Sequence, residues 1–293
     1  MFIKIARKLI WTWERNRPSF SRLYLNRLPV STCCRTSGFP SINVLCTPST
    51  LTEAAYSAWS WSDQLGSSFA LRIVVDGIFD SKYASEIRAL IDGLEIVSAL
   101  DLIDTDLLQS KGLGPLGYKH PMGRKLLLSL SLQRHEDHIY SDNDVLIFNY
   151  PEAIVSALQR ETATYNQEST QPCYSDEILH RAADLGLQPC NALNGGLLYF
   201  PKNSMNIDLA NELALAKSDV DYSWFDEQTI FSVLMNQASA QPLSKDLYVV
   251  NTQRQFWPGK DVDYTAIVSR HFTSPVRHLM YAHGYPILRR KRG

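Results

Sequence analysis

The sequence predicts an α/β fold in which helices cover both faces of a central sheet. Short apolar runs at 42–46, 69–75 and 94–98 alternate with helical segments along the chain. Strands buried on both faces are apolar throughout, and their alternation with helices is typical of α/β proteins. The 293 residues are enough for one such domain of about 200–250 residues with an extension.

Each element has a local signal. The first strand, 42–46, ends in the turn Thr47-Pro48-Ser49, and Glu53 then marks the first turn of a helix that should extend through Trp59. The second strand stops at Asp76-Gly77. A Gly/Pro-rich loop is predicted over 112–123, and a leucine-rich buried helix over 124–134. The other expected elements are helices at 83–91, 103–110, 176–183, 206–217 and 225–238, and strands at 94–98, 197–200, 246–250 and 265–270.

The charge is distributed unevenly. The chain holds 29 Lys+Arg and 30 Asp+Glu, but residues 1–36 carry eight basic residues and one acid, and residues 289–292 carry four basic residues. Residues 37–288 therefore hold 17 basic and 29 acidic residues, a net charge of −12. We expect a basic extension over 1–38, one domain over 39–288 and a basic tail over 289–293. A net charge near zero argues against a protein that coats nucleic acid, so no nucleic-acid partner is expected.

Targeting signals are weak. No apolar run approaches the ~18 residues of a membrane span, and Lys4, Arg7 and Lys8 interrupt the apolar core that a secretory signal needs. The number of cysteines is odd, and no Cys-x-x-Cys spacing is present, which favours reduced thiols in a cytoplasmic protein. The cysteines are Cys33, Cys34, Cys46, Cys173 and Cys190.

The N-terminal segment 1–36 combines basic residues with Trp11 and Trp13. An amphipathic basic segment of this kind can lie in an anionic membrane interface. We therefore expect a cytoplasmic protein that attaches peripherally to the membrane through this segment. A helix packed on the domain, or a disordered basic arm, explains the same pattern.

The triplet Asp142-Asn143-Asp144 lies between two apolar runs, so both acids are expected where a buried strand ends. Mg²⁺ and Mn²⁺ prefer oxygen ligands, and one or two carboxylates together with substrate phosphates form a common site. A cation held there could neutralise a departing diphosphate. Alone, Asp-x-Asp is also common in surface turns.

The order of motifs resembles nucleotide-sugar glycosyltransferases of the GT-A fold, most closely glycosyltransferase family 8. After the Asp-x-Asp triplet come Asn194-Gly195-Gly196, Asp226-Glu227-Gln228 and Arg270-His271-Phe272. The resemblance spans roughly residues 42–283, although the matching residues are confined to these short motifs. It implies a mixed sheet flanked by helices, and transfer of a sugar from a nucleoside diphosphate sugar, UDP-sugars favoured, to an acceptor hydroxyl with retention.

The resemblance also implies roles for the motif residues. Asp142 and Asp144 would hold Mn²⁺ (or Mg²⁺) and the donor diphosphate together with Asn143, and His271 would complete the metal site. Asn194 would act at the reacting sugar, with Gly195 and Gly196 allowing the donor to approach the backbone.

In the second acidic motif, Asp226 and Glu227 would face the reacting sugar. The family has Asp-Gln-Asp where this chain has Asp226-Glu227-Gln228, which leaves the roles of the second and third residues open. If the enzyme inverts, Asp226 is the first candidate for the general base. Asp226 could equally cap the helix that follows.

Four further residues are expected to bind the donor. Thr47 and Asp76 follow the first two strands, where the nucleotide of such enzymes lies, and Lys125 opens the leucine-rich helix. Lys125 could instead be a surface cation whose stem covers apolar surface. The family's usual lysine after the histidine motif is replaced here, and Arg277 or His278 is expected to contact phosphate in its place.

Two other functions use the same residues. A phosphatase of the haloacid-dehalogenase type would use Asp142 as its nucleophile, but Leu146 stands where such enzymes normally have Thr or Val, and the chain has no Asp-Asp pair. A catalytically inactive protein that binds sugar nucleotides is the second alternative.

Overall fold

The computed structural model describes residues 25, 28–33, 40–168, 173–217, 221–250, 262–273 and 276–290. Its centre is a mixed seven-stranded sheet with the strand order β10-β8-β9-β6-β2-β3-β5. The strands are β2 (Ser41–Cys46), β3 (Ala70–Val75), β5 (Glu95–Ser98), β6 (His138–Asp142), β8 (Thr164–Gln167), β9 (Leu193–Phe200) and β10 (Gln241–Pro242). The neighbours of β9, which are β6 and β8, both run antiparallel to it, whereas β6, β2, β3 and β5 are parallel.

Two smaller sheets flank this centre. One pairs β1 (Ser31–Thr32) with β4 (Ile91–Asp92), and the other has the order β11-β12-β7. The strands of the second are β7 (Val145–Ile147), β11 (Tyr248–Val250) and β12 (Ser269–His271). Because β7 follows β6 after a two-residue turn, the second sheet is tied directly to the end of a central strand.

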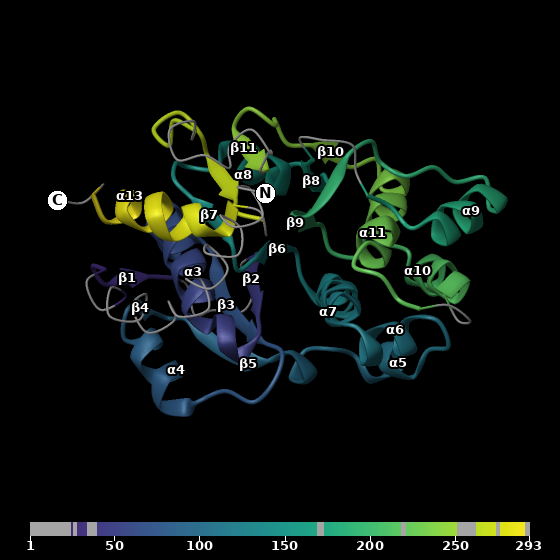
Figure 1. Ribbon diagram of the computed structural model, residues 1–293, viewed down its shortest axis with the longest axis horizontal. Helices are drawn as coiled ribbons and strands as arrows, with labels where there is room; N and C mark the ends of the chain where they lie inside the picture. Colours follow the sequence, from purple (N-terminus) through teal and green to yellow (C-terminus); the bar gives the residue numbers. More distant parts are fainter. Residues whose placement is uncertain are drawn as a thin grey trace, which may run out of the picture.

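Helices cover both faces of the central sheet. Helix α3 and the C-terminal α13 lie on one side, and α7, α10 and α11 lie on the other (Figure 1). Each side has its own hydrophobic cluster, with Trp59 and Trp61 of α3 in one and Leu126 to Leu128 of α7 in the other. The helices are α3 (Leu51–Leu65), α4 (Ser81–Arg88), α5 (Thr105–Gln109), α6 (Leu113–Lys119), α7 (Pro121–His135), α8 (Glu152–Gln159), α9 (Asp176–Asp184), α10 (Ile207–Ala214), α11 (Asp226–Gln237), α12 (Arg277–Leu279) and α13 (Tyr285–Arg290).

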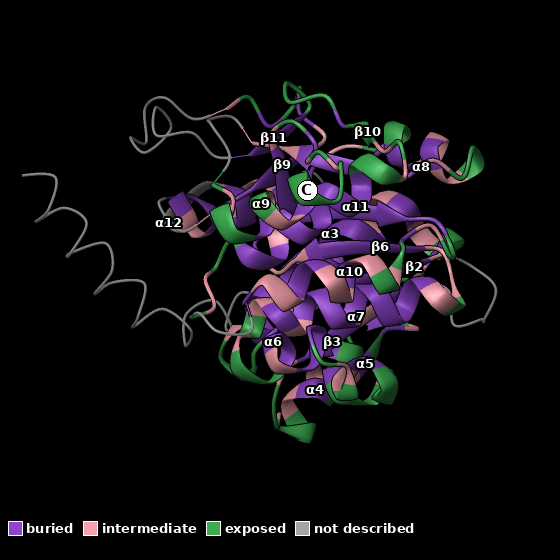
Figure 2. Ribbon diagram, turned by 90° about the vertical axis from the view of Figure 1, so that its right-hand side faces the viewer, coloured by how far each residue is buried: buried purple, intermediate pink, exposed green. Residues whose placement is uncertain are grey.

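The predicted α/β architecture is therefore confirmed, and local chemistry explains its main elements. The strand β2 is buried along almost its whole length, as expected between helical layers, although Ser41 and Asn43 are polar (Figure 2). Helix α7 begins with Pro121 at its first turn, and the His120 side chain accepts a hydrogen bond from the backbone of Met122. In the described part of the chain, no helix has both the length and the apolar character needed to cross a membrane.

The predicted loop over 112–123 is wrong, because residues 113–119 form α6. Gly and Pro weaken the helical signal of this segment, but α6 gains stability by packing on α7, where Leu113 and Leu116 are buried. Helix α8 and strand β8 were not expected from the sequence. Both are short, and β8 contains the polar residues Asn166 and Gln167.

Part of the predicted basic extension packs on the domain. Leu25 and Leu28 are buried, and β1 pairs in parallel with β4. The Trp59 indole donates a hydrogen bond to the carbonyl of Pro29 at 2.8 Å. A two-residue strand is too short to show in the hydrophobic pattern, so β1 could not be predicted from it. Trp11 and Trp13 lie outside the described residues.

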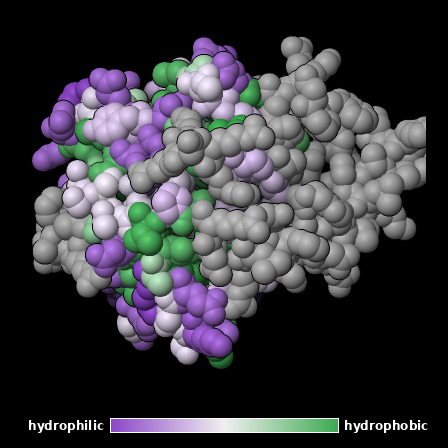
Figure 3. Space-filling view, turned by 90° about the vertical axis from the view of Figure 1, so that its left-hand side faces the viewer, coloured by the Kyte–Doolittle hydropathy of each residue, from purple (hydrophilic) through white to green (hydrophobic). Residues whose placement is uncertain are grey.

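The side of the molecule that carries β1, β4 and α13 shows hydrophobic atoms gathered between hydrophilic ones (Figure 3). Val30, which directly precedes β1, is 64% exposed. At the other end of the chain, α13 extends to Arg290 and so includes the first two residues of the predicted basic tail. The boundaries of the extension and of the tail stay predictions.

A buried histidine in β6 predicts a specific pH dependence of stability. His138 stacks on Phe200, and neither of its ring nitrogens has a hydrogen-bond partner among the described residues. Burial, with a smaller effect of Arg72, lowers the pKa of His138 from 6.5 to about 3. Between pH 6.5 and about pH 3, His138 is therefore protonated in the unfolded chain but neutral in the folded chain.

The expected result is a loss of stability as the pH falls through this window, with a contribution of about 1.4 kcal/mol per pH unit. Urea unfolding measured between pH 4 and 8 checks this. The variant His138→Phe should lose this contribution to the slope, whereas an unchanged slope would contradict the assignment.

Candidate metal and donor site

The parallel strands end at one edge of the sheet and bring predicted site residues together there. Because β2 pairs in parallel with both β3 and β6, the residues that follow these strands share an edge. Thr47 follows β2, Asp76 follows β3, and Asp142 ends β6. The carboxyl ends of strands are where open α/β sheets bind ligands.

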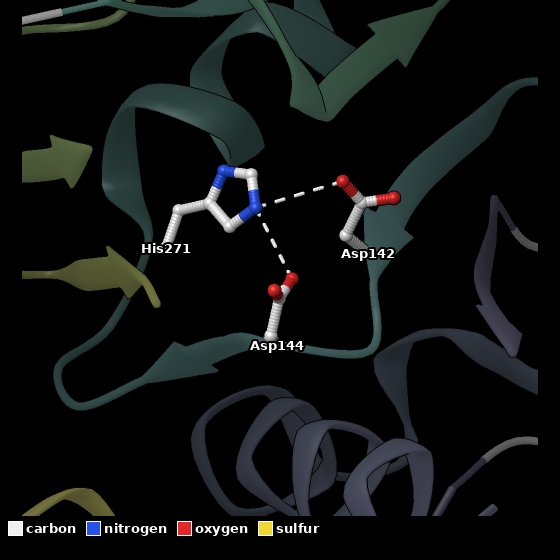
Figure 4. Close-up of side chains that lie close together, drawn as sticks. All are labelled: Asp142, Asp144 and His271. Atoms are coloured by element: carbon white, nitrogen blue, oxygen red, sulfur yellow. Dashed lines mark ion pairs between the residues drawn. The ribbon is translucent and has the colours of Figure 1, made fainter. Parts of the chain in front are cut away.

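Asp142, Asp144 and His271 converge at this edge, as the sequence predicted. Their side chains point toward one another (Figure 4), and one ligand atom from each lies within 4.8 Å of the others. His271 Nε2 is 3.1 Å from Asp144 Oδ1 and 3.6 Å from Asp142 Oδ2. Asp144 and His271 are buried, whereas Asp142 is partly exposed.

The backbone fixes this convergence. Strand β12 pairs antiparallel with β7 in a register that places His271 opposite Val145, directly after Asp144. The Phe272 N–H donates to the carbonyl of Asp144 at 2.8 Å. Residues that are 127 positions apart in the sequence are thus held by a ladder of main-chain hydrogen bonds. Asp142 ends β6, and Asp144 is the second residue of the turn that leads into β7.

The ionisable side chains of the cluster shift one another's pKa values. Burial alone would raise the pKa of Asp144, but the Arg277 guanidinium and His271 hold that pKa well below its usual range. Burial opposes the charge on His271, but Asp144 and Asp142 raise its pKa above the ordinary value. An Arg277 nitrogen donates directly to Asp144 Oδ2, so this carboxylate already has a cationic partner.

The donor set fits a divalent cation. Two carboxylates and one imidazole match the oxygen and nitrogen ligands that Mn²⁺ accepts, and the partly exposed Asp142 leaves room for ligand oxygens. Asp142, Asp144 and His271 are therefore the residues that could hold such an ion.

Asn194, Gly195 and Gly196 lie on β9 directly behind the cluster. Asn194 Oδ1 is 2.9 Å from His271 Nδ1, and it also accepts from the Gly196 N–H at 2.9 Å. A Cβ at Gly196 would lie 2.3 Å from the His271 ring, which explains a glycine at this position. At Gly195 a Cβ would meet Glu227 Oε1 at 2.9 Å and Lys125 Nζ at 3.0 Å. The predicted contact of Asn194 with a sugar stays a prediction.

Lys125 is buried between two acids and is not a surface cation. Its Nζ is 2.7 Å from Glu227 Oε1, 3.5 Å from Asp142 Oδ1 and 4.8 Å from the centre of the Tyr140 ring. Burial disfavours its charge, but Asp142 and Glu227 raise the pKa of Lys125, so it stays a cation. Burial raises the pKa of Glu227, against the opposing effect of Lys125. Lys125 thus links Glu227 of α11 to the acid that ends β6.

A cavity of about 390 Å³ opens in front of the cluster. It is lined by the predicted residues Thr47, Asp76, Asn143 and Arg277 together with the three metal-site residues. Asp76 also pairs with Arg124, whose Nε is 3.1 Å away. The sequence-predicted donor residues therefore share one cavity, except Lys125, Gly195 and Gly196, which lie behind it.

Asp226 is placed differently from Glu227. It is fully buried at the start of α11, and its carboxylate accepts hydrogen bonds from the Ser223 N–H at 2.7 Å and the Ser223 hydroxyl at 2.8 Å. Lys217 Nζ lies 3.7 Å from it. Asp226 is not among the described residues that line the cavity. The capping role that was open from the sequence is therefore wrong: Phe225 is the N-cap of α11, no described side chain caps this helix end, and the Asp226 carboxylate instead holds Ser223 ahead of the helix.

Sequence reasoning did not single out several residues of this region. Tyr140 donates its hydroxyl to Asp142, and its position two residues earlier on β6 puts both side chains on one face, which the sequence could have indicated. Met122 and Trp224 line the cavity. Glu168 accepts from Asn194 Nδ2 at 2.6 Å, but it lies in a stretch without motif signals.

Solved structures share this fold. Mouse xyloside xylosyltransferase 1 is 11% identical with a TM-score of 0.55, over 81% of this chain and 98% of its own. The galactosyltransferase LgtC, solved with donor and acceptor sugar analogues, is 12% identical with a TM-score of 0.56, over 86% of this chain and 95% of its own. The glycosyltransferase GlyE of Streptococcus pneumoniae is 10% identical with a TM-score of 0.51, over 87% of this chain and 63% of its own.

These likenesses confirm the GT-A fold that the motif order predicted. At identities near 10% they establish the fold alone. No family model and no curated protein matches the sequence.

Proposed function

We propose that this protein is a metal-dependent glycosyltransferase that moves a sugar from a nucleoside diphosphate sugar to an acceptor hydroxyl. The observation that carries the proposal is the convergence of Asp142, Asp144 and His271 at a cavity on the carboxyl edge of a GT-A sheet. A bound divalent cation, Mn²⁺ or Mg²⁺, would supply charge stabilisation to the leaving diphosphate. We take UDP-sugars as the favoured donors.

The chain's own residues would bind the donor in two zones. Thr47 and Asp76, after β2 and β3, line the part of the cavity that would take the nucleoside, and Asn143 lies between the two acids. Arg277 pairs with Asp144, lines the same cavity and would contact the diphosphate. Charge-assisted hydrogen bonds of this kind are stronger than neutral ones and suit a leaving group that gains charge.

In the reaction, the bond between the anomeric carbon and the diphosphate oxygen breaks, and the acceptor oxygen forms the new bond while its proton passes to an oxygen of the departing diphosphate. Of the two acids predicted to face the sugar, Glu227 lies next to Gly195 and is linked through Lys125 to Asp142. Both carboxylate oxygens of Asp226 already accept hydrogen bonds from Ser223. We therefore favour Glu227 over Asp226 as the carboxylate nearest the reacting sugar, and retention as the stereochemical outcome.

The decisive experiment is a nucleotide-release assay on the full chain with a panel of UDP- and GDP-sugars, with and without Mn²⁺. We expect Mn²⁺-dependent release of the nucleoside diphosphate that is lost in Asp142→Ala. Release of inorganic phosphate from a monoester would favour the phosphatase alternative, although that enzyme class is not the one whose fold this chain has. Tight binding of a sugar nucleotide without any turnover would favour the inactive binding protein.

Arg277→Gln is expected to change two affinities in opposite directions. Arg277 shares Asp144 with the proposed cation, so its loss should strengthen binding of Mn²⁺ alone. The same change removes a charged hydrogen bond to the diphosphate, worth about 1.5–3 kcal/mol, and should weaken UDP binding in saturating Mn²⁺ by roughly 10- to 100-fold. Calorimetry with each ligand measures both effects. Arg134→Gln, at a surface pair with Asp104, is the matched control, and two affinities that fall together would contradict the proposal.

We also propose that the basic N-terminal segment attaches this cytoplasmic enzyme to anionic membranes. Because Leu25 and Leu28 belong to the core, the segment to remove is 1–24 rather than 1–36. Sedimentation with phosphatidylserine vesicles should recover the full chain at low salt and lose it at high salt, whereas the shortened chain should stay in the supernatant. Equal recovery of both proteins would refute the attachment.

A further inference from the structure

The two ring nitrogens of His271 face different surroundings. Nε2 points at the acids, 3.1 Å from Asp144 Oδ1, and Nδ1 points at β9, 2.9 Å from Asn194 Oδ1. A neutral imidazole has one N–H and one lone pair, and only the nitrogen with the lone pair can bind a cation. The partner of Nδ1 therefore decides whether Nε2 is available.

The orientation of the Asn194 amide is fixed at both ends. The Gly196 main-chain N–H, which can only donate, lies 2.9 Å from one amide atom, so that atom is the oxygen. The amide nitrogen then faces Glu168 Oε1 at 2.6 Å, where a carboxylate accepts its hydrogen. With its oxygen toward His271, Asn194 can only accept a hydrogen bond from Nδ1. Asn194 thus holds a proton on Nδ1, so a cation between Asp142 and Asp144 would replace only the proton on Nε2 and bind the lone pair that this nitrogen then offers.

We propose that Asn194 and Glu168 are positioning residues that hold His271 in the Nδ1–H form, with its Nε2 directed at a divalent cation between Asp142 and Asp144. The proposal rests on the metal site of the proposed function. It assigns to Glu168 a role that no motif in the sequence suggested, and it gives Asn194 a task besides any contact with a sugar.

The fold around Glu168 supports this role. The ladder between β8 and β9 is interrupted between Tyr165 and Asn166, where the register shifts. Glu168 then donates its N–H to the carbonyl of Ala192 at 2.7 Å, which holds it beside the start of β9. Ala192 has a φ of 58°, a left-handed conformation that is uncommon for a residue with a side chain. The irregularity brings the Glu168 carboxylate to the Asn194 amide.

The test combines a spectroscopic and a binding measurement on the full chain. Long-range ¹H–¹⁵N spectra of the metal-free protein, recorded as the pH is raised until the ring signals stop shifting, report which nitrogen of the neutral His271 ring carries the proton. Electron paramagnetic resonance measures the affinity for Mn²⁺ alone. We expect the Nδ1–H form in the unmodified protein. Asn194→Leu should give a mixture of the two forms and a 10- to 100-fold loss of Mn²⁺ affinity.

An exchange of the two functional groups separates positioning from a merely structural role. In Asn194→Asp combined with Glu168→Gln, the new carboxylate can accept from His271 and Gly196 while the new amide donates to it. This double variant should recover the Nδ1–H form and most of the Mn²⁺ affinity, whereas Asn194→Asp alone sets two carboxylates against each other and should not.

Three results would overturn the inference: an Nε2–H ring in the unmodified protein, Mn²⁺ affinity unchanged in Asn194→Leu, or no binding of Mn²⁺ to the unmodified protein. The third result, together with continued release of nucleotide from a UDP-sugar without metal, would overturn only the positioning role and leave the transferase proposal standing.

Discussion

Replacing Asp144 with asparagine is expected to slow Mn²⁺-dependent nucleotide release by about a thousandfold. A metal ion contributes several kcal/mol to the stabilisation of a leaving diphosphate, and each 1.4 kcal/mol corresponds to about a factor of ten in rate. Asp144 is the buried acid of the cluster, and it contacts both His271 and Arg277. Asparagine keeps the shape but removes the charge, so Mn²⁺ binding should weaken while the fold is retained.

Asp104→Asn provides a matched control, because Asp104 pairs with Arg134 at 2.8 Å outside the cavity. It loses the same kind of carboxylate–arginine pair, and nucleotide release should stay within about twofold of the unmodified protein. Both variants need melting curves to show that they fold. Full activity of a folded Asp144→Asn protein would refute the metal assignment, since no other described residue completes a set of three ligands with Asp142 and His271.

The parts of the site that the sequence could predict are those with local signals. Asp142 and Asp144 lie between two apolar strands, so their position at a sheet edge follows from the pattern alone. The resemblance then assigned His271 to the same site, and the register of β12 on β7 explains how it arrives there. Here local strand signals and tertiary pairing agree: the three side chains lie together, and their binding of a metal stays a prediction.

The features that escaped prediction depend on contacts between distant segments. The sequence around Lys125 predicts a helix but does not show whether the lysine side chain faces water or the core. The packing of α7 against α11 brings it to Glu227. Glu168 reaches Asn194 through a shift in strand register, which leaves no periodic trace in the sequence. Helix α6 carries two glycines and a proline, so tertiary packing had to override its low intrinsic propensity.

The burial of Lys125 leads to the largest expected effect on stability. Lys125→Met removes the cation that lies 2.7 Å from Glu227 and leaves a carboxylate that is only 3% exposed without its partner. Breaking a buried ion pair on one side typically costs about 3–5 kcal/mol, because the remaining charge is left uncompensated. Urea unfolding at neutral pH should show this loss. Lys119→Met, where the exposed lysine lies over the Tyr222 ring, should change stability by no more than about 0.5 kcal/mol.

The double variant Lys125→Met with Glu227→Gln distinguishes a lost ion pair from lost packing. If the uncompensated charge causes the loss of stability, the double variant should recover most of it, and the two changes should couple strongly in a double-mutant cycle.

The pH dependence of stability gives an independent check. Burial already raises the pKa of Glu227, and loss of Lys125 should raise it further, so the folded single variant binds a proton that the unfolded chain releases above about pH 4.5. Its deficit should therefore be smaller at pH 5 than at pH 8. The loss of stability in Lys125→Met could instead be the same at both pH values and unchanged by Glu227→Gln. That result would show that the methylene stem of Lys125, and not its charge, supports the core.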